Sequence, residues 1–196
     1  MPAPAVAYLT RKYNALAGVV ISASHNPGEY NGIKFFDSKG FKLPDEVEEE
    51  IEDIILNNKD VNLNPVGENI GRVILEDKGS EDYINYLTSN IGLDLTGVKI
   101  AMDCGHGALY KIGPELIKRL GGNLVVINTE PTGMNINDNC GSTNPEMIQE
   151  LVKKEKADIG ISFDGDGDRI IAVDELGNII DGDHILAICS SYLKDK

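Results

Sequence analysis

The chain has 196 residues, of which 32 are acidic and 18 are basic, and its formal net charge is −14. This acid excess argues against nucleic acid or an anionic membrane surface as a partner, because both carry negative charge themselves. No apolar stretch is long enough to span a bilayer, and the start shows no secretory signal pattern. We therefore expect a cytoplasmic protein with one large or two small domains.

The cysteines give no sign of a disulfide framework. Cys104, Cys140 and Cys189 are odd in number, lie far apart and lack the spacing of metal ligands. We expect all three to be reduced thiols.

Local patterns in the first third predict a helix, two strands and a second helix. The first helix is expected over residues 4–14, and the apolar run 17–21 is typical of a buried strand. Residues 32–36 predict the next strand. Asp45 is placed to cap a helix ending near residue 55, with Glu48 in position for a capping box. On this helix four apolar residues share one face, namely Val47, Ile51, Ile54 and Ile55.

A polar, glycine-bearing stretch, residues 57–71, separates these elements from an alternating α/β pattern. That pattern is a β-α-β-α-β order after one short helix, and it favours a largely parallel sheet. The expected strands are 98–102, 123–127 and 158–163, and the expected helices are 81–88, 114–120, 145–156 and, further on, 184–192.

The most informative motif is Asp-Gly-Asp-Gly-Asp-Arg at residues 164–169. Asp164, Asp166 and Asp168 alternate with glycines that let the backbone turn tightly, and Arg169 follows them. Oxygen ligands at this density suit a hard divalent cation such as Mg²⁺ or Ca²⁺, and without one the three carboxylates repel each other. The competing interpretation is a solvated acidic turn, which Asp-Gly pairs commonly form.

An EF-hand calcium loop is a second competing interpretation of this motif. The three aspartates match its first, third and fifth positions, and Glu175 matches its twelfth. Its sixth position requires glycine, however, and here it is Arg169. The flanking runs 158–163 and 170–173 are typical of strands, whereas an EF-hand needs helices, so we exclude it.

A second polar motif, Ser-Ala-Ser-His-Asn-Pro at residues 22–27, follows the strand 17–21. A serine on a loop at a strand end, such as Ser24, suits a nucleophile or a phosphate carrier. Taken alone, Ser24 and His25 are ordinary loop residues, and Lys34 on the next strand is a surface cation. The motif does not match the Gly-x-Ser-x-Gly elbow of hydrolases.

Two other segments have weaker functional signals. Residues 103–107 form a strand-to-helix turn, in which we assign His106 a structural role. Residues 135–142 form a long polar loop that could close over the aspartate loop, but the sequence gives it no catalytic role.

Taken together, residues 18–36 (GVVISASHNPGEYNGIKFF) and 163–183 (FDGDGDRIIAVDELGNIIDGD) closely resemble the α-D-phosphohexomutase superfamily. The similarity extends over essentially the whole chain, with supporting stretches at 4–11, 40–52, 110–116 and 131–146. It implies an α/β fold of three-layer domains with mixed, largely parallel sheets. Members have four domains, so the chain is expected to be truncated. We expect the end of the first domain over residues 1–78, the second over 79–175 and the start of the third over 176–196.

The resemblance also implies residue roles. Ser24 would carry a phosphoryl group, and Asp164, Asp166 and Asp168 would hold one Mg²⁺ together with an oxygen of the phosphoserine. The metal would withdraw charge from the phosphoryl group being transferred.

Three further residues complete the expected site. Lys34 is the candidate general acid or base, because a lysine desolvated beside other cations loses its proton more easily. Arg169 is expected to contact the same phosphate, and His25 to brace the phosphoserine.

Within the superfamily, the chain looks most like the isomerases that interconvert glucosamine 6-phosphate and glucosamine 1-phosphate through a sugar bisphosphate. Glucose and mannose phosphate mutases share both loops and stay an alternative, since the loop that selects the sugar lies outside this chain. The other alternative is a metal- or phosphate-binding fragment without turnover. Because the first domain is incomplete, we also expect an exposed sheet edge and self-association.

Overall fold

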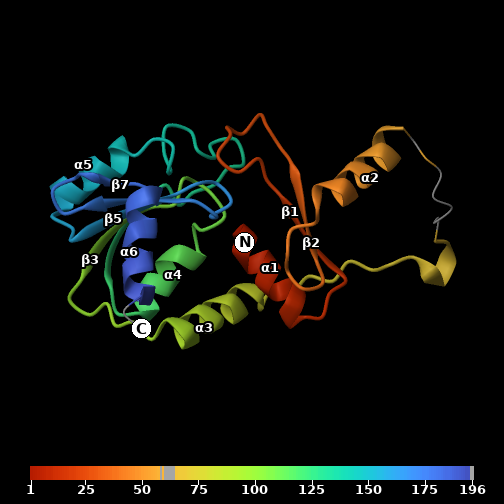
Figure 1. Cartoon of the computed structure of the whole chain (residues 1–196), viewed down its shortest axis with the longest axis horizontal. Coiled ribbons are helices and arrows are strands. Elements are labelled where there is room, and N and C mark those ends of the chain that lie inside the picture. Colours follow the sequence, from red (N-terminus) through yellow and green to blue (C-terminus); the bar gives the residue numbers. More distant parts are fainter. Residues whose placement is uncertain (58, 60–64, 195–196) are drawn as a thin grey trace.

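The computed structural model describes residues 1–57, 59 and 65–194 (Figure 1). The predicted polar stretch 57–71 and the predicted segment 176–196 lie partly outside these residues. Among the described helices, none combines the length and the apolar character needed to cross a membrane.

The first part of the chain is a small hairpin unit. It contains α1 (Ala3–Lys12), β1 (Ala17–Ile21), β2 (Ile33–Asp37) and α2 (Asp45–Leu56). The strands pair antiparallel, with Ala17 opposite Asp37 and Ile21 opposite Ile33, and α1 packs against β1. The predicted strands and helices are confirmed here within one or two residues.

Two details of this unit correct the sequence predictions. Strand β1 is buried only at alternate residues: Val20 is 7% exposed, whereas Val19 and Ile21 are 48% and 69% exposed. Among the described residues, α1 packs against one face of this two-stranded sheet, while α2 lies beside the other face and leaves much of it exposed. Asp45 is not the cap of α2 either; the N-cap is Pro44 in an extended conformation, with no side-chain cap bond. Asp45 is the first helical residue, where its charge favours the helix dipole.

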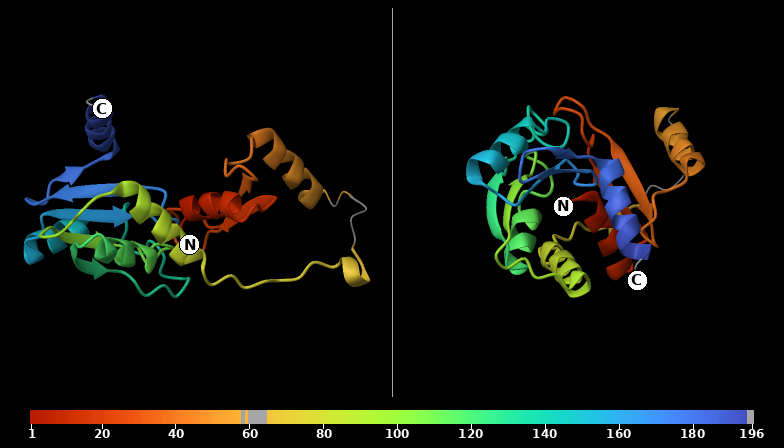
Figure 2. Two further views of the ribbon diagram at one scale, coloured as in Figure 1. Left: turned by 90° about the horizontal axis from the view of Figure 1, so that it is seen from below. Right: turned by 60° about the vertical axis from the view of Figure 1, so that its left-hand side comes forward.

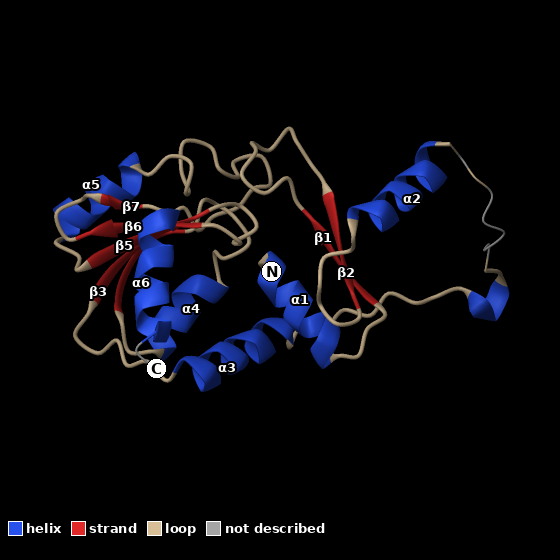
Figure 3. Ribbon diagram, viewed as in Figure 1, coloured by secondary structure: helices blue, strands red, loops and turns tan. Residues whose placement is uncertain are grey.

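The second part of the chain is a five-stranded mixed sheet with helices (Figure 3). Its strand order is β4-β3-β5-β6-β7; β3 is parallel to β4 and β5, while β6 and β7 run antiparallel to their neighbours. The predicted β-α-β-α-β order is confirmed, and β7 was not predicted because two residues show no pattern. The elements of this part are α3 (Gly79–Ile91), β3 (Lys99–Asp103), α4 (Ile112–Arg119), β4 (Asn123–Ile127), α5 (Glu146–Glu155), β5 (Ile159–Phe163), β6 (Ile170–Asp174), β7 (Ile179–Ile180) and α6 (Gly182–Lys194). A short 3-10 helix, η1 (Gly67–Asn69), precedes them and lies beyond α2, away from the sheet (Figure 1).

This sheet is covered on both faces, which confirms the predicted three-layer α/β fold. Side chains alternate along β3: Ile100 and Met102 pack with Ile117 of α4, whereas Ala101 packs with Ile148 and neighbouring residues of α5. Helices α4 and α5 therefore lie on opposite faces of the sheet (Figure 2).

Helix α1 joins the two parts. Its Ala5 shares a core cluster with Tyr83 of α3 and Ile112 of α4, and the backbone N–H of Ala3 donates to the carbonyl oxygen of Asp166 at 2.8 Å. This packing brings the β1–β2 loop against the loop between β5 and β6, where the two polar motifs meet.

Candidate active site

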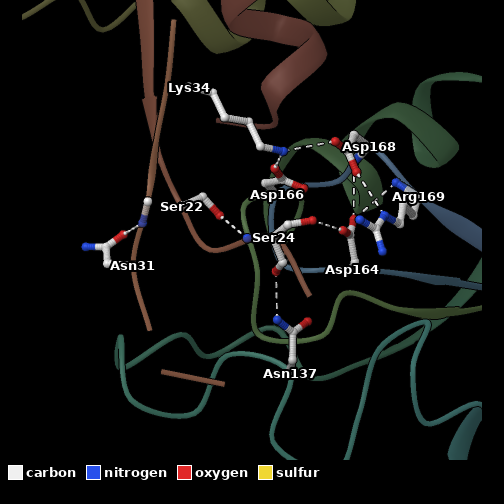
Figure 4. A network of polar contacts seen from close by, with 10 residues as sticks. Ser22, Ser24, Asn31, Lys34, Asn137, Asp164, Asp166, Asp168 and Arg169 are labelled. Carbon is white, nitrogen blue, oxygen red and sulfur yellow. Dashed lines mark hydrogen bonds and ion pairs between the residues drawn. The ribbon is translucent and has the colours of Figure 1, made fainter. Parts of the chain in front are cut away.

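Ser24 lies in the loop between β1 and β2, with its backbone in the left-handed region (φ 55°) and only 8% of the residue exposed. Its hydroxyl donates to the Asp164 carboxylate at 2.8 Å, and its backbone N–H donates to the Ser22 hydroxyl at 3.0 Å (Figure 4). Beside it lies a hollow of about 180 Å³, whose lining includes Asn26 and Tyr30. The serine and the aspartate motif, 140 residues apart, are thus in direct contact.

The aspartate loop joins β5 to β6, as the sequence predicted. One oxygen of each of Asp164, Asp166 and Asp168 lies within 4.8 Å of the other two. Asp164 and Asp166 are only 1% exposed. The Asp164 oxygen that does not bind the Ser24 hydroxyl accepts the backbone N–H groups of Asp168 and Arg169, at 3.2 and 3.1 Å, so the loop curls around this carboxylate.

Lys34 extends from β2 over the same loop. Its ammonium group donates to Asp166 at 2.6 Å and to Asp168 at 3.2 Å (Figure 4). Partial burial alone would lower its pKa, but the hydrogen bonds and charges of the two carboxylates outweigh burial and raise the pKa of Lys34. The expected lowering is therefore wrong for this arrangement, because the neighbours of Lys34 are anions and not cations.

The buried aspartates respond to their surroundings in opposite directions. Burial, together with the charges of its two neighbours in the loop, raises the pKa of Asp164 above its ordinary value. For Asp166, burial also acts upward, but the hydrogen bond and charge of Lys34 outweigh it and hold the pKa of Asp166 below its ordinary value.

The residues present fit a hard divalent cation. Among the described residues, Asp166 Oδ1 is a buried side-chain oxygen with no hydrogen-bond partner. A buried carboxylate oxygen left without a donor is costly, and a cation bound among the three aspartates would satisfy it.

The other two predicted site residues, Arg169 and His25, lie beside the cluster but have weaker contacts with it. The guanidinium of Arg169 lies 3.9 Å from the carboxylate of its neighbour Asp168, and its side chain is 56% exposed. His25 follows Ser24 directly, and its buried Nδ1 has no hydrogen-bond partner among the described residues.

Sequence reasoning missed two residues that hold this site together. Asn137, from the predicted polar loop, donates through its side-chain amide to the carbonyl oxygens of Ser24 and Asn26 at 2.8 and 3.0 Å. Asp103, wholly buried at the end of β3, accepts the backbone N–H of Gly141 at 2.8 Å. The available signal for Asp103 was its place at the carboxyl end of a parallel strand, where functional loops cluster.

Comparison with known families agrees with this geometry. The family model for phosphoglucomutase/phosphomannomutase, alpha/beta/alpha domain I, matches residues 1–62, and that for domain II of the same family matches residues 81–177. The chain belongs to the phosphoglucomutase/phosphomannomutase family. Ser24 lies in the part that matches domain I, and the three aspartates lie in the part that matches domain II.

Individual relatives place the chain within this family. It is 59% identical over 196 residues to a phosphoglucosamine mutase of Alkaliphilus oremlandii, covering 100% of this chain and 44% of that protein. The chain therefore spans less than half the length of this curated relative.

Solved structures share the fold. A putative phosphomannomutase from Thermus thermophilus aligns with all of this chain and 45% of its own, with a TM-score of 0.79 and 24% identity. N-acetylphosphoglucosamine mutase of Aspergillus fumigatus, solved in complex with GlcNAc-6P and magnesium, aligns with all of this chain and 53% of its own, with a TM-score of 0.57 and 19% identity.

Proposed function

We propose that this chain supplies the phosphoserine and metal loops of a phosphoglucosamine mutase, which interconverts glucosamine 6-phosphate and glucosamine 1-phosphate. The observation that carries the proposal is the 2.8 Å hydrogen bond from the Ser24 hydroxyl to Asp164, inside a cluster of three carboxylates. The phosphoglucosamine mutase that is 59% identical over all of this chain supports the choice of sugar.

The proposed reaction begins with a phosphoryl group on the Ser24 oxygen. The P–O bond to Ser24 breaks and a P–O bond to a free hydroxyl of the sugar phosphate forms. The proton that this hydroxyl loses is balanced by the proton that the departing Ser24 oxygen gains. The resulting sugar bisphosphate reorients and returns its other phosphoryl group to Ser24. Positioning and neutralisation of oxygen charge carry most of the rate in such transfers.

Asp164, Asp166 and Asp168 would hold one Mg²⁺, with an oxygen of phospho-Ser24 as a further ligand. When bound, the cation supplies Lewis-acid stabilisation of the transferring phosphoryl oxygens. The magnesium complex of the A. fumigatus mutase and the unpartnered oxygen of Asp166 support this assignment.

Lys34 is proposed as the residue that exchanges protons during transfer. Its raised pKa keeps it an ammonium here, so its first role is to donate a proton toward the departing Ser24 oxygen and to stabilise negative charge. Arg169 and His25 are proposed as phosphate contacts, for which their places beside Asp168 and Ser24 are the support.

The remaining expectations also stay proposals. These are the domain limits at residues 1–78, 79–175 and 176–196, a cytoplasmic location, self-association, and the lack of nucleic-acid and membrane partners. Activity of the full-length protein on glucosamine, glucose and mannose phosphates would separate the sugar assignments.

The direct test is phosphopeptide mapping of the chain before and after exposure to glucose 1,6-bisphosphate with Mg²⁺. We expect a phosphoryl group on Ser24 that is absent from the Ser24→Ala variant. Phosphate on an aspartate of the 164–168 loop, or a bare Ser24 under both conditions, would contradict the proposal for this chain.

A further inference from the structure

Ser24 is held in an unfavourable backbone conformation. Its φ of 55° is uncommon for a residue with a Cβ, so surrounding contacts must hold it there. One contact comes from within the hairpin unit: the N–H of Ser24 donates to the Ser22 hydroxyl. The other comes from outside this unit: the carbonyl oxygen of Ser24 accepts a hydrogen bond from the side-chain amide of Asn137 at 2.8 Å.

The side chain of Asn137 is fixed in one orientation. Both of its partners, the carbonyl oxygens of Ser24 and Asn26, only accept hydrogen bonds, so the amide nitrogen must face them. Asn137 is 7% exposed, and its own N–H donates to the carbonyl oxygen of Gly105 at 3.0 Å. The amide is therefore a buried bridge between the serine loop and the part of the chain that carries the aspartates.

The loop that carries Asn137 is itself anchored to the sheet. The buried Asp103 carboxylate accepts the N–H groups of Gly105 and Gly141, each at 2.8 Å, and the side-chain amide of Asn128 at 2.9 Å. Bonds from buried donors to a carboxylate are stronger than neutral ones, so they fix the loop firmly.

The same loop also contacts the start of the aspartate motif. A Cβ added at Gly165 would lie 2.6 Å from the Ser24 carbonyl oxygen and 2.9 Å from the Asn137 amide nitrogen. Ser24, Asn137 and the aspartate loop thus lie together (Figure 4). A side chain at position 165 would collide with both Ser24 and Asn137, so glycine is required there.

We propose that Asn137 is a positioning residue for phosphoryl transfer: its amide clamps the Ser24 backbone so that the serine oxygen faces the Asp164–Asp168 loop. This inference rests on the proposed function, because it assigns Asn137 a role in that same reaction. Misplacing a reacting atom by about 1 Å costs roughly 100-fold in rate. Loss of the clamp should therefore slow the loading of Ser24 by about that factor.

The test compares two asparagines of the same loop. Asn137→Asp keeps the shape but sets a carboxylate against two carbonyl oxygens. Asn139→Asp is the matched control, because both asparagines have a positive φ (57° and 51°), but Asn139 is exposed and, among the described residues, its side chain bonds only to Asp138. Asn137→Gly, with Asn139→Gly as its control, removes the amide without straining the left-handed backbone.

Two readouts are measured on the full chain of each variant. The first is the rate of Ser24 phosphorylation by glucose 1,6-bisphosphate with Mg²⁺, as a function of bisphosphate concentration. We expect both Asn137 variants to lose about 100-fold in the maximal rate with little change in the half-saturating concentration, while both Asn139 variants match the parent. If a variant merely contained less folded protein, the final fraction of loaded Ser24 would fall, but the rate constant of loading would not change.

The second readout is hydrogen exchange of the peptide that contains residues 22–32, which needs no activity. We expect about tenfold faster exchange there in the Asn137 variants only. Unchanged exchange overturns the clamp, and so does loading at the parent rate. If the parent never loads Ser24 but exchange rises as expected, Asn137 does hold the serine loop, but the proposed function fails and so does the role of Asn137 in phosphoryl transfer.

Discussion

Replacing Lys34 with methionine tests whether this ammonium neutralises the aspartate loop in the absence of metal. The side chain of Asp166 is 1% exposed, and its partner Lys34 is 30% exposed at 2.6 Å. Coulomb attraction at that distance in an effective dielectric constant of about 20 is about 6 kcal/mol. Desolvation of the carboxylate and the partial exposure of the ammonium offset much of this, so we expect the Lys34→Met variant to lose about 2 kcal/mol of unfolding free energy.

The assay is urea unfolding followed by circular dichroism, in EDTA and again in MgCl₂. Lys34 and a cation among the aspartates would neutralise the same two carboxylates, those of Asp166 and Asp168, and would repel each other. Removal of Lys34 should therefore tighten Mg²⁺ binding by at least about tenfold, and saturating Mg²⁺ should restore more stability to the variant than to the parent.

Lys39→Met provides the matched control, because Lys39 follows β2 on the same hairpin, is exposed, and forms no ion pair within the described part of the chain. We expect it to behave like the parent in both buffers. If Lys34→Met were as stable as Lys39→Met in EDTA, or if Mg²⁺ stabilised the two variants equally, the reasoning from charge neutralisation would be wrong.

Three further predictions concern packing, thiols and assembly. Gly141→Ala should cost about 1–3 kcal/mol more than Gly133→Ala in urea unfolding, because both have positive φ but only the Gly141 Cβ would lie 2.8 Å from a carbonyl oxygen of β5. At pH 8 Ellman's reagent should modify the exposed Cys189 alone, since burial raises the pKa of Cys104 and Cys140 to about 12; rapid reaction of three native thiols would refute this. Light scattering should show a molar mass that rises on concentration, because the exposed face of the β1–β2 hairpin is apolar; a constant monomer mass would refute self-association.

Much of the fold followed from local patterns in the sequence. Apolar runs bounded by glycine or polar residues placed β3, β4 and β5 within a residue, and helical spacing placed α4 and α5. On α2 the apolar residues Val47, Ile54 and Ile55 are 38%, 37% and 63% exposed. This exposure and that of β1 did not follow from the sequence, because burial depends on which other elements cover a surface. A local pattern records only which residues share a face.

The candidate site divides in the same way. The candidate metal site could be predicted from the aspartate motif alone, because three carboxylates at alternate positions have few structural uses. The contact between Ser24 and Asp164 was expected only through the resemblance to a family, since no local signal joins residues 140 apart. Asn137 was missed for a further reason: its amide acts on backbone carbonyl oxygens, and such contacts leave no pattern in the side-chain sequence.

Several contacts hold Ser24 in the position that the proposed phosphoryl transfer requires. Its hydroxyl donates to Asp164, its carbonyl oxygen binds Asn137, and its loop is pressed against Gly165. The N–H of Ala3 in α1 donates to the carbonyl oxygen of Asp166. Each contact joins the hairpin unit to the five-stranded sheet unit, so a shift of one unit against the other by about 1 Å would separate serine from aspartates and cost roughly 100-fold in transfer. If the proposed transfer takes place, its rate should therefore depend on the stability of this junction as well as on the groups that touch the phosphate.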